Sequence, residues 1–120
     1  PDKAFSETAA SDAMNDLFGT DKTTASDQVM LKVPQIAENG AVVPIRVKSS
    51  LEKVESIYIF VEKNYVPFAA RFTLSPEVEP SVSARIKMAE TCDVIVIAEA
   101  DGKVFSARQM VKVTIGVCGG

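Results

Sequence analysis

Apolar and polar residues alternate along most of the chain after residue 28, with the period of two that is typical of half-buried β-strands. Residues 43–48 show it most clearly, because valine and isoleucine there alternate with proline, arginine and lysine. Residues 94–98 are almost entirely apolar, as expected of a central strand. Asn39-Gly40 and Asp101-Gly102 are tight-turn signals. The pattern predicts strands at 29–33, 43–47, 54–61, 68–74, 81–88, 94–98 and 104–115.

About seven short strands, separated by turns roughly every 8–12 residues, favour an all-β fold. The sequence shows no strong helical pattern after residue 28. We therefore predict an immunoglobulin-like antiparallel β-sandwich. The chain has no tryptophan, and its cysteines at 92 and 118 lack the spacing seen in antibody domains.

The first part of the chain has a helical period instead. Residues 6–18 are expected to form one helix that ends at Gly19, with an apolar stripe at Ala10, Met14, Leu17 and Phe18. Residues 22–27 are polar and are expected to be a linker. The predicted organisation is a helix and linker (1–27), a β-sandwich domain (28–115) and a flexible C-terminal arm (116–120).

The candidate chemistry lies in this arm. Cys118 is placed between glycines, and Gly116, Val117, Gly119 and Gly120 complete the segment. Glycine tolerates almost any backbone angle, so we expect a mobile arm whose thiol reaches about 10 Å beyond Ile115. An inert tail is the alternative. A working thiol is the favoured interpretation, because an exposed free cysteine otherwise invites oxidation.

Composition removes several classes of function. The chain of 120 residues has the length of one domain, and its net charge of −3 argues against nucleic-acid binding. No apolar run approaches the ~20 residues of a membrane span. The absence of histidine removes the commonest general base and metal ligand, so we expect no catalytic residue, metal or cofactor. Any chemistry at Cys118 then needs groups from another protein. Cys92 is expected to be a buried core thiol, with a redox or disulfide role as the alternative.

Several segments of the sequence resemble a known family. Residues 111–120, and also 39–44, 61–64, 84–88 and 101–104, resemble SoxY, the substrate carrier of the bacterial sulfur-oxidation (Sox) system. SoxY proteins end in Gly-Gly-Cys-Gly-Gly. Gly116, Cys118, Gly119 and Gly120 match this ending, whereas Val117 departs from it.

The resemblance implies a function and a setting. A SoxY protein holds sulfur intermediates covalently on its arm cysteine, here Cys118, during thiosulfate oxidation. A partner cytochrome enzyme loads the cysteine, a hydrolase releases sulfate, and some organisms add a sulfur dehydrogenase. The resemblance further implies a heterodimer with SoxZ and a periplasmic location. A disulfide dimer through Cys118 is also conceivable from the exposed thiol.

Two other interpretations stay open at this stage. Ubiquitin-like modifiers and thiocarboxylate sulfur carriers also end in Gly-Gly, and there the carboxylate, here that of Gly120, is activated. An immunoglobulin-like binding module could use Cys118 only to dimerise. Ile57, Ile59 and the N-terminal helix are candidates for a partner surface if they are exposed.

Overall fold

The structure, a computed structural model, describes residues 2–4, 9–20 and 22–117. Among these residues it contains one helix and ten strands. They are β1 (Asp2–Ala4), α1 (Ala9–Phe18), β2 (Lys22–Ala25), β3 (Val29–Lys32), β4 (Ile36–Asn39), β5 (Val43–Ser49), β6 (Val54–Val61), β7 (Phe68–Thr73), β8 (Ser81–Ile86), β9 (Cys92–Ala100) and β10 (Lys103–Ile115).

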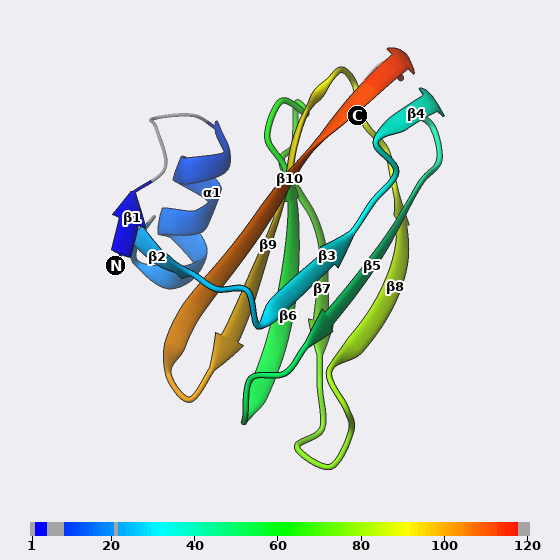
Figure 1. Ribbon diagram of the computed structural model, residues 1–120. Helices are drawn as coiled ribbons and strands as arrows, with labels where there is room; N and C mark the ends of the chain where they lie inside the picture. Colours follow the sequence, from blue (N-terminus) through cyan, green and yellow to red (C-terminus); the bar gives the residue numbers. More distant parts are fainter. Residues whose placement is uncertain (1, 5–8, 21, 118–120) are drawn as a thin grey trace.

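The strands form two sheets that pack face to face, with α1 against the outer side of the larger one (Figure 1). The larger sheet has the order β1-β2-β10-β9-β6-β7, and β4 pairs with the far end of β10. The smaller sheet has the order β3-β5-β8. The predicted all-β, immunoglobulin-like sandwich is confirmed.

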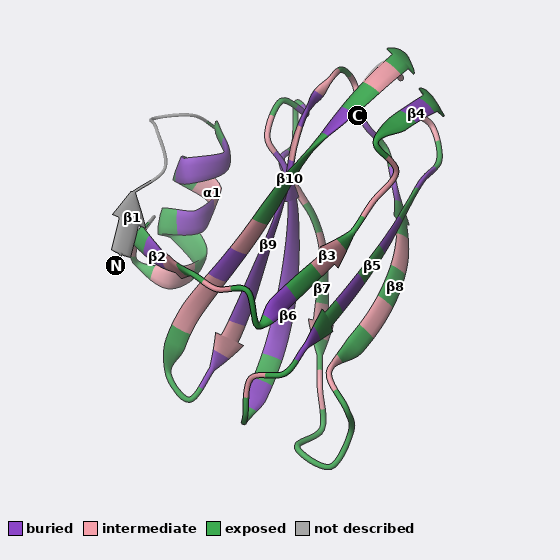
Figure 2. Ribbon diagram, viewed as in Figure 1, coloured by how far each residue is buried: buried purple, intermediate pink, exposed green. Residues whose placement is uncertain are grey.

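The central strands β6 and β9 are apolar over most of their length because they are covered on both faces. Ile57, Ile59 and Val96 point into the core between the sheets, whereas Phe60 and Ile95 point toward α1. All five are at most 1% exposed. In β5, by contrast, buried and exposed residues alternate strictly, because only one face of the smaller sheet is covered (Figure 2). This burial removes Ile57 and Ile59 as candidates for a partner surface.

The helix largely follows the predicted stripe. Ala10 is 1% exposed and Met14 fully buried, and α1 ends where Gly19 adopts φ of +70° and its N–H donates to the carbonyl of Asn15. The prediction is wrong for Leu17, which is 42% exposed. Leu17 lies at the edge of the packed face, and Ser11 completes that face instead.

The strand count is higher than the predicted seven because of three short strands. Strands β2 and β4 pair with the long β10, and β1 pairs with β2. Strands of three or four residues are too short to show a period in the sequence. The expected linker at 22–27 therefore contains β2, whose buried Thr23 donates a hydrogen bond to the Ser106 hydroxyl (2.8 Å). Strands β2 and β4 both run parallel to β10, an exception to the antiparallel pattern.

Candidate functional site

Strand β10 carries the chain to one end of the sandwich, beside β4, where the arm begins (Figure 1). Of the predicted site residues, Cys118, Gly119 and Gly120 lie outside the described residues. Gly116 and Val117 are described, and they show how the body holds the start of the arm.

Gly116 lies against the backbone of the loop between β8 and β9. A Cβ atom at this position would be 1.8 Å from the carbonyl oxygen of Ala89. The next residue, Val117, donates its N–H to the carbonyl of Met88 (3.1 Å). From the sequence, flexibility is expected to begin at Gly116. In the structure, glycine at 116 serves close backbone approach, and hydrogen bonding to the body continues through Val117.

A second glycine locks the same corner. Gly40 donates its N–H to the carbonyl of Ile115 (2.7 Å) and accepts a hydrogen bond from the N–H of Met88 (2.7 Å). A Cβ atom at Gly40 would be 2.2 Å from the Met88 carbonyl oxygen. Asn39-Gly40 was predicted as a turn, and the structure adds the close approach of Gly40 to the backbone of Met88. We call the three interlocked segments 39–40, 88–89 and 115–117 the arm root.

The loop that supports the arm root is itself held by two polar side chains. The buried Asn64 donates through Nδ2 to the carbonyl of Lys87 (2.7 Å) and accepts the Ala89 N–H through Oδ1 (2.9 Å). The Thr91 hydroxyl accepts the N–H of Val113 in β10 (2.9 Å). Sequence reasoning missed both residues, because a turn asparagine and a loop threonine carry no signal of distant partners.

The arm root therefore holds residues 115–117 against the body of the sandwich. Its contacts are backbone amides and carbonyls, supported by the neutral side chains of Asn64 and Thr91. An ion-pair cluster of Arg108 with Glu62 (3.0 Å) and Asp93 (2.6 Å) connects β10, β9 and the turn that follows β6. These groups fix geometry at the end of the sandwich, and the root contacts themselves include no general acid or base.

The second cysteine, Cys92, is a core thiol, as predicted. It begins β9, lies opposite Val111 and is 2% exposed. Burial raises the pKa of its thiol above the ordinary value of 9.0, and the nearby carboxylates of Glu62 and Asp93 add to the increase. A hydrogen bond from the backbone of Lys63 acts in the opposite direction.

This burial leads to a prediction for thiol reactivity and pH dependence. Cys92 should resist alkylation in the folded protein at pH 7 and react only after denaturation, because the buried thiol is neutral and inaccessible. Its pKa is raised on folding, so its contribution to stability is present below about pH 9 and is lost as pH rises through the folded-state pKa. Peptide mapping after iodoacetamide treatment, and urea unfolding of wild type and Cys92→Ala between pH 7 and 10.5, measure both effects. Rapid labelling of Cys92 in the native state would contradict the prediction.

Within residues 2–4, 9–20 and 22–117, there is no group of three or more histidine, cysteine or carboxylate side chains that could hold a metal ion. In the same ranges, none of the helical structure is long and apolar enough to cross a membrane.

Comparison with known proteins identifies the family. The family model described as sulfur oxidation protein SoxY matches residues 14–118. The solved structure of the sulfur carrier protein SoxY from Chlorobium limicola f thiosulfatophilum is 38% identical, with a TM-score of 0.80 over 88% of this chain and 91% of that chain. A superoxide reductase (neelaredoxin) from Ignicoccus hospitalis shares the fold at 18% identity, with a TM-score of 0.60 over 72% of this chain and 80% of that chain. No curated protein matches the sequence. With the matched family model spanning the sandwich and reaching Cys118, the chain belongs to the SoxY family of sulfur oxidation proteins.

Proposed function

We propose that this protein holds sulfur intermediates covalently on Cys118 and presents them to partner enzymes during thiosulfate or sulfur oxidation. The observation that carries the proposal is the position of Cys118, inside the matched family region and one residue after Val117, the last residue seen hydrogen-bonded to the arm root. An anchored root, followed by a cysteine with Gly119 and Gly120 after it, suits a tethered cargo.

The chemistry is proposed to come from the partners. The chain has no histidine, and the arm root offers no acid or base to Cys118. Loading with thiosulfate joins the cysteine sulfur to the outer sulfur of thiosulfate, releases the thiol proton and passes two electrons to a cytochrome enzyme. Attack of water on the sulfonate sulfur then releases sulfate and leaves a persulfide on Cys118. By family resemblance, the partners are a SoxZ-type subunit, the cytochrome, the hydrolase and a sulfur dehydrogenase, and the location is the periplasm.

The test is intact mass spectrometry of protein purified without reductant, followed by fragmentation of the last ten residues. We expect a reducible sulfur-containing adduct on Cys118 in wild type, the same adduct in Cys92→Ala, and none in Cys118→Ser. Cys92→Ala is the matched control, because it removes the buried thiol and leaves the arm unchanged.

Other results would replace the proposal. A modified carboxyl at Gly120, with Cys118 unmodified, would indicate a carrier of the ubiquitin-like or thiocarboxylate class. An unloaded thiol after incubation with thiosulfate and the Sox cytochrome, together with dimers that disappear in Cys118→Ser, would indicate a dimerising module instead.

A further inference from the structure

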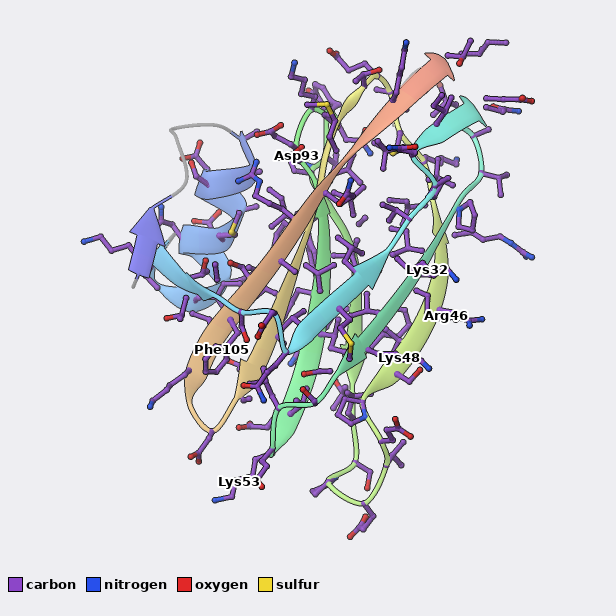
Figure 3. All side chains as sticks on the ribbon, viewed as in Figure 1. Lys32, Arg46, Lys48, Lys53, Asp93 and Phe105 are labelled. Carbon is purple, nitrogen blue, oxygen red and sulfur yellow. The ribbon has the colours of Figure 1, made fainter. Side chains whose placement is uncertain are left out.

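The outer face of the smaller sheet is unusually basic. Its exposed residues are Met30, Lys32, Pro44, Arg46, Lys48, Ser81, Ser83 and Arg85. Four of these are cationic, and the strands β3, β5 and β8 contain no aspartate or glutamate. Figure 3 shows Lys32, Arg46 and Lys48 along this outer side. We call this surface the basic face.

This charge is segregated from the rest of the molecule. The chain has 16 acidic and 13 basic residues, so its composition does not by itself favour a surface that carries basic residues and no acidic ones. Without the four cations of the basic face, the formal net charge of −3 becomes −7 for the rest of the chain. Among the residues that the structure describes, no carboxylate forms an ion pair with any of the four cations of the basic face, Lys32, Arg46, Lys48 and Arg85.

Strand register makes the arrangement costly for the isolated protein. Lys32 of β3 lies directly opposite Arg46 of β5, and like charges in opposing positions are destabilising. A merely solvated face would be stabilised by a carboxylate at either position. An anionic surface placed over Lys32 and Arg46 would relieve this repulsion.

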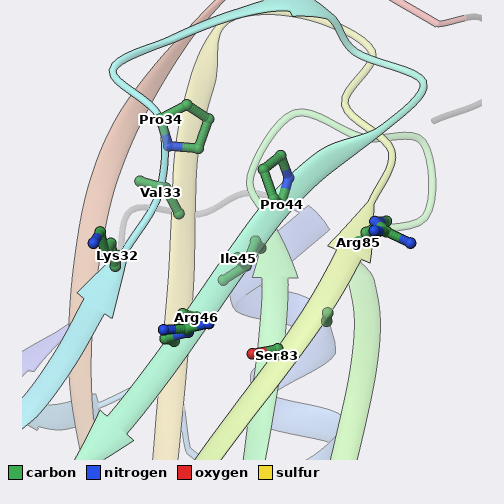
Figure 4. Close-up of a pocket in the computed structure, with 9 residues that line it drawn as sticks. Lys32, Val33, Pro34, Pro44, Ile45, Arg46, Ser83 and Arg85 are labelled. Carbon is green, nitrogen blue, oxygen red and sulfur yellow. The ribbon is translucent and has the colours of Figure 1, made fainter.

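A groove of about 760 Å³ gives the basic face its shape (Figure 4). It forms where the chain leaves β3 after Lys32 and crosses toward β10, where the Gln35 carbonyl accepts the N–H of Lys112. Pro34 and Pro44 lie in the groove, with Lys32 and Arg85 on opposite sides. Arginine beside exposed apolar surface is a combination enriched at protein interfaces.

We propose that the basic face is a docking surface for an acidic surface of a partner protein. The exposed cations do not form a closed site for a small anion, and Pro44 to Lys48 alone extend over about 14 Å at roughly 3.4 Å per residue. A nucleic acid would be repelled by the −7 carried by the rest of the chain. A protein surface that carries carboxylates can match the width of the basic face and complement its charge, without the dense negative charge of a nucleic acid.

The basic face also adjoins the arm root. Strand β5 begins at Val43, shortly after Gly40, and β8 ends at Ile86, shortly before Met88. A protein bound over Pro44 and Arg85 would therefore lie beside the start of the arm. In choosing Sox proteins as probes, the inference rests on the proposed function.

The test measures the binding of purified SoxZ, Sox cytochrome and Sox hydrolase, each separately, by biolayer interferometry at low and high salt. In the double variant Arg46→Glu/Arg85→Glu, we expect at least one partner to bind about tenfold or more weakly at low salt. Wild-type binding of that partner should weaken with salt, because exposed charges are screened. The matched control is Lys22→Glu/Lys103→Glu, which also lowers the formal net charge to −7 but changes exposed lysines away from the basic face. This control should bind within about twofold of wild type.

Several outcomes would overturn the inference. Equal loss in both double variants would show an effect of net charge alone, and normal binding of all three partners to Arg46→Glu/Arg85→Glu would show that the basic face is not used. If wild type dimerises in sedimentation equilibrium and the variant does not, a second copy is the occupant. Binding of millimolar thiosulfate or sulfate that only this variant loses, without change in partner binding, would indicate a small-anion site. The Cys118 adduct is measured independently, so loading with normal partner binding refutes the docking surface alone.

Discussion

Replacing Gly116 with alanine is expected to slow the loading of Cys118 by partner enzymes about tenfold or more, since ångström-scale displacement of a reacting group can cost up to about 100-fold. The added Cβ would lie 1.8 Å from the Ala89 carbonyl oxygen. The backbone fixes the position of a Cβ, and the oxygen is itself a backbone atom, so neither can rotate away. The strand end must move, which breaks the hydrogen bond from Val117 to Met88. The free energy of unfolding should fall by about 1–3 kcal/mol. Adduct formation followed by mass spectrometry, together with urea unfolding, measures both effects.

Gly19→Ala is the control for this experiment. Gly19 has φ of +70°, and apart from its chain neighbours nothing lies within 4 Å of where a Cβ would be, so alanine strains the backbone there without contacting the arm root. It should cost about 1 kcal/mol and leave the loading rate unchanged. If Gly116→Ala loads at the wild-type rate, the close approach at Ala89 has no role in presenting the cysteine.

The two glycines of the arm root change the interpretation of the family motif. From sequence, Gly116 was expected to supply freedom. In the structure, Gly116 and Gly40 both supply space, because a side chain at either position would collide with backbone carbonyls of residues 88–89. The family motif thus begins with a glycine that allows close packing. Cys118 follows residues 115–117, whose position is fixed by contacts with segments 39–40 and 88–89.

The sandwich strands were predictable where one physical pattern dominates. Strand β5 alternates because one of its faces is solvated, and the apolar run of β9 reflects burial on both faces. The turn at Asp101-Gly102 was also predictable, because both residues have positive φ, which these residue types tolerate best. The short strands β1, β2 and β4 were not, because they are formed by pairing to another element and not by an internal pattern.

The candidate site was predictable only in part, because some of its contacts join residues that are distant in the sequence. The thiol and its glycines are adjacent in sequence, and family resemblance marks them, although Cys118 lies outside the described residues. Asn64 acts on residues 87–89, more than twenty positions away. The basic face required the register of three strands, which sets Lys32 opposite Arg46 and Pro44 opposite Arg85. Sequence order alone does not reveal such juxtapositions.

The second large effect is expected at the interface between α1 and the larger sheet. Met14 is fully buried there against a cluster that includes Phe60, Ile95 and Ile97. Met14→Ala removes most of this side chain and leaves a cavity, so the free energy of unfolding should fall by about 2–5 kcal/mol. This is a large part of the roughly 5–15 kcal/mol that stabilises a typical domain. Urea unfolding monitored by both far-ultraviolet circular dichroism and tyrosine fluorescence measures it.

Leu17→Ala provides the matched comparison on the same helix. Leu17 is 42% exposed, so its truncation should cost less than about 1 kcal/mol, although the sequence pattern grouped it with Met14. The pair also tests whether α1, which packs on the larger sheet, unfolds cooperatively with the sandwich. If α1 stabilises the sandwich, Met14→Ala will shift a single cooperative transition, because Phe60 and Ile95 belong to the central strands that the sandwich core also uses. If α1 is independent, the main transition will stay in place, and the clustering of Met14 with the central strands will have no energetic role.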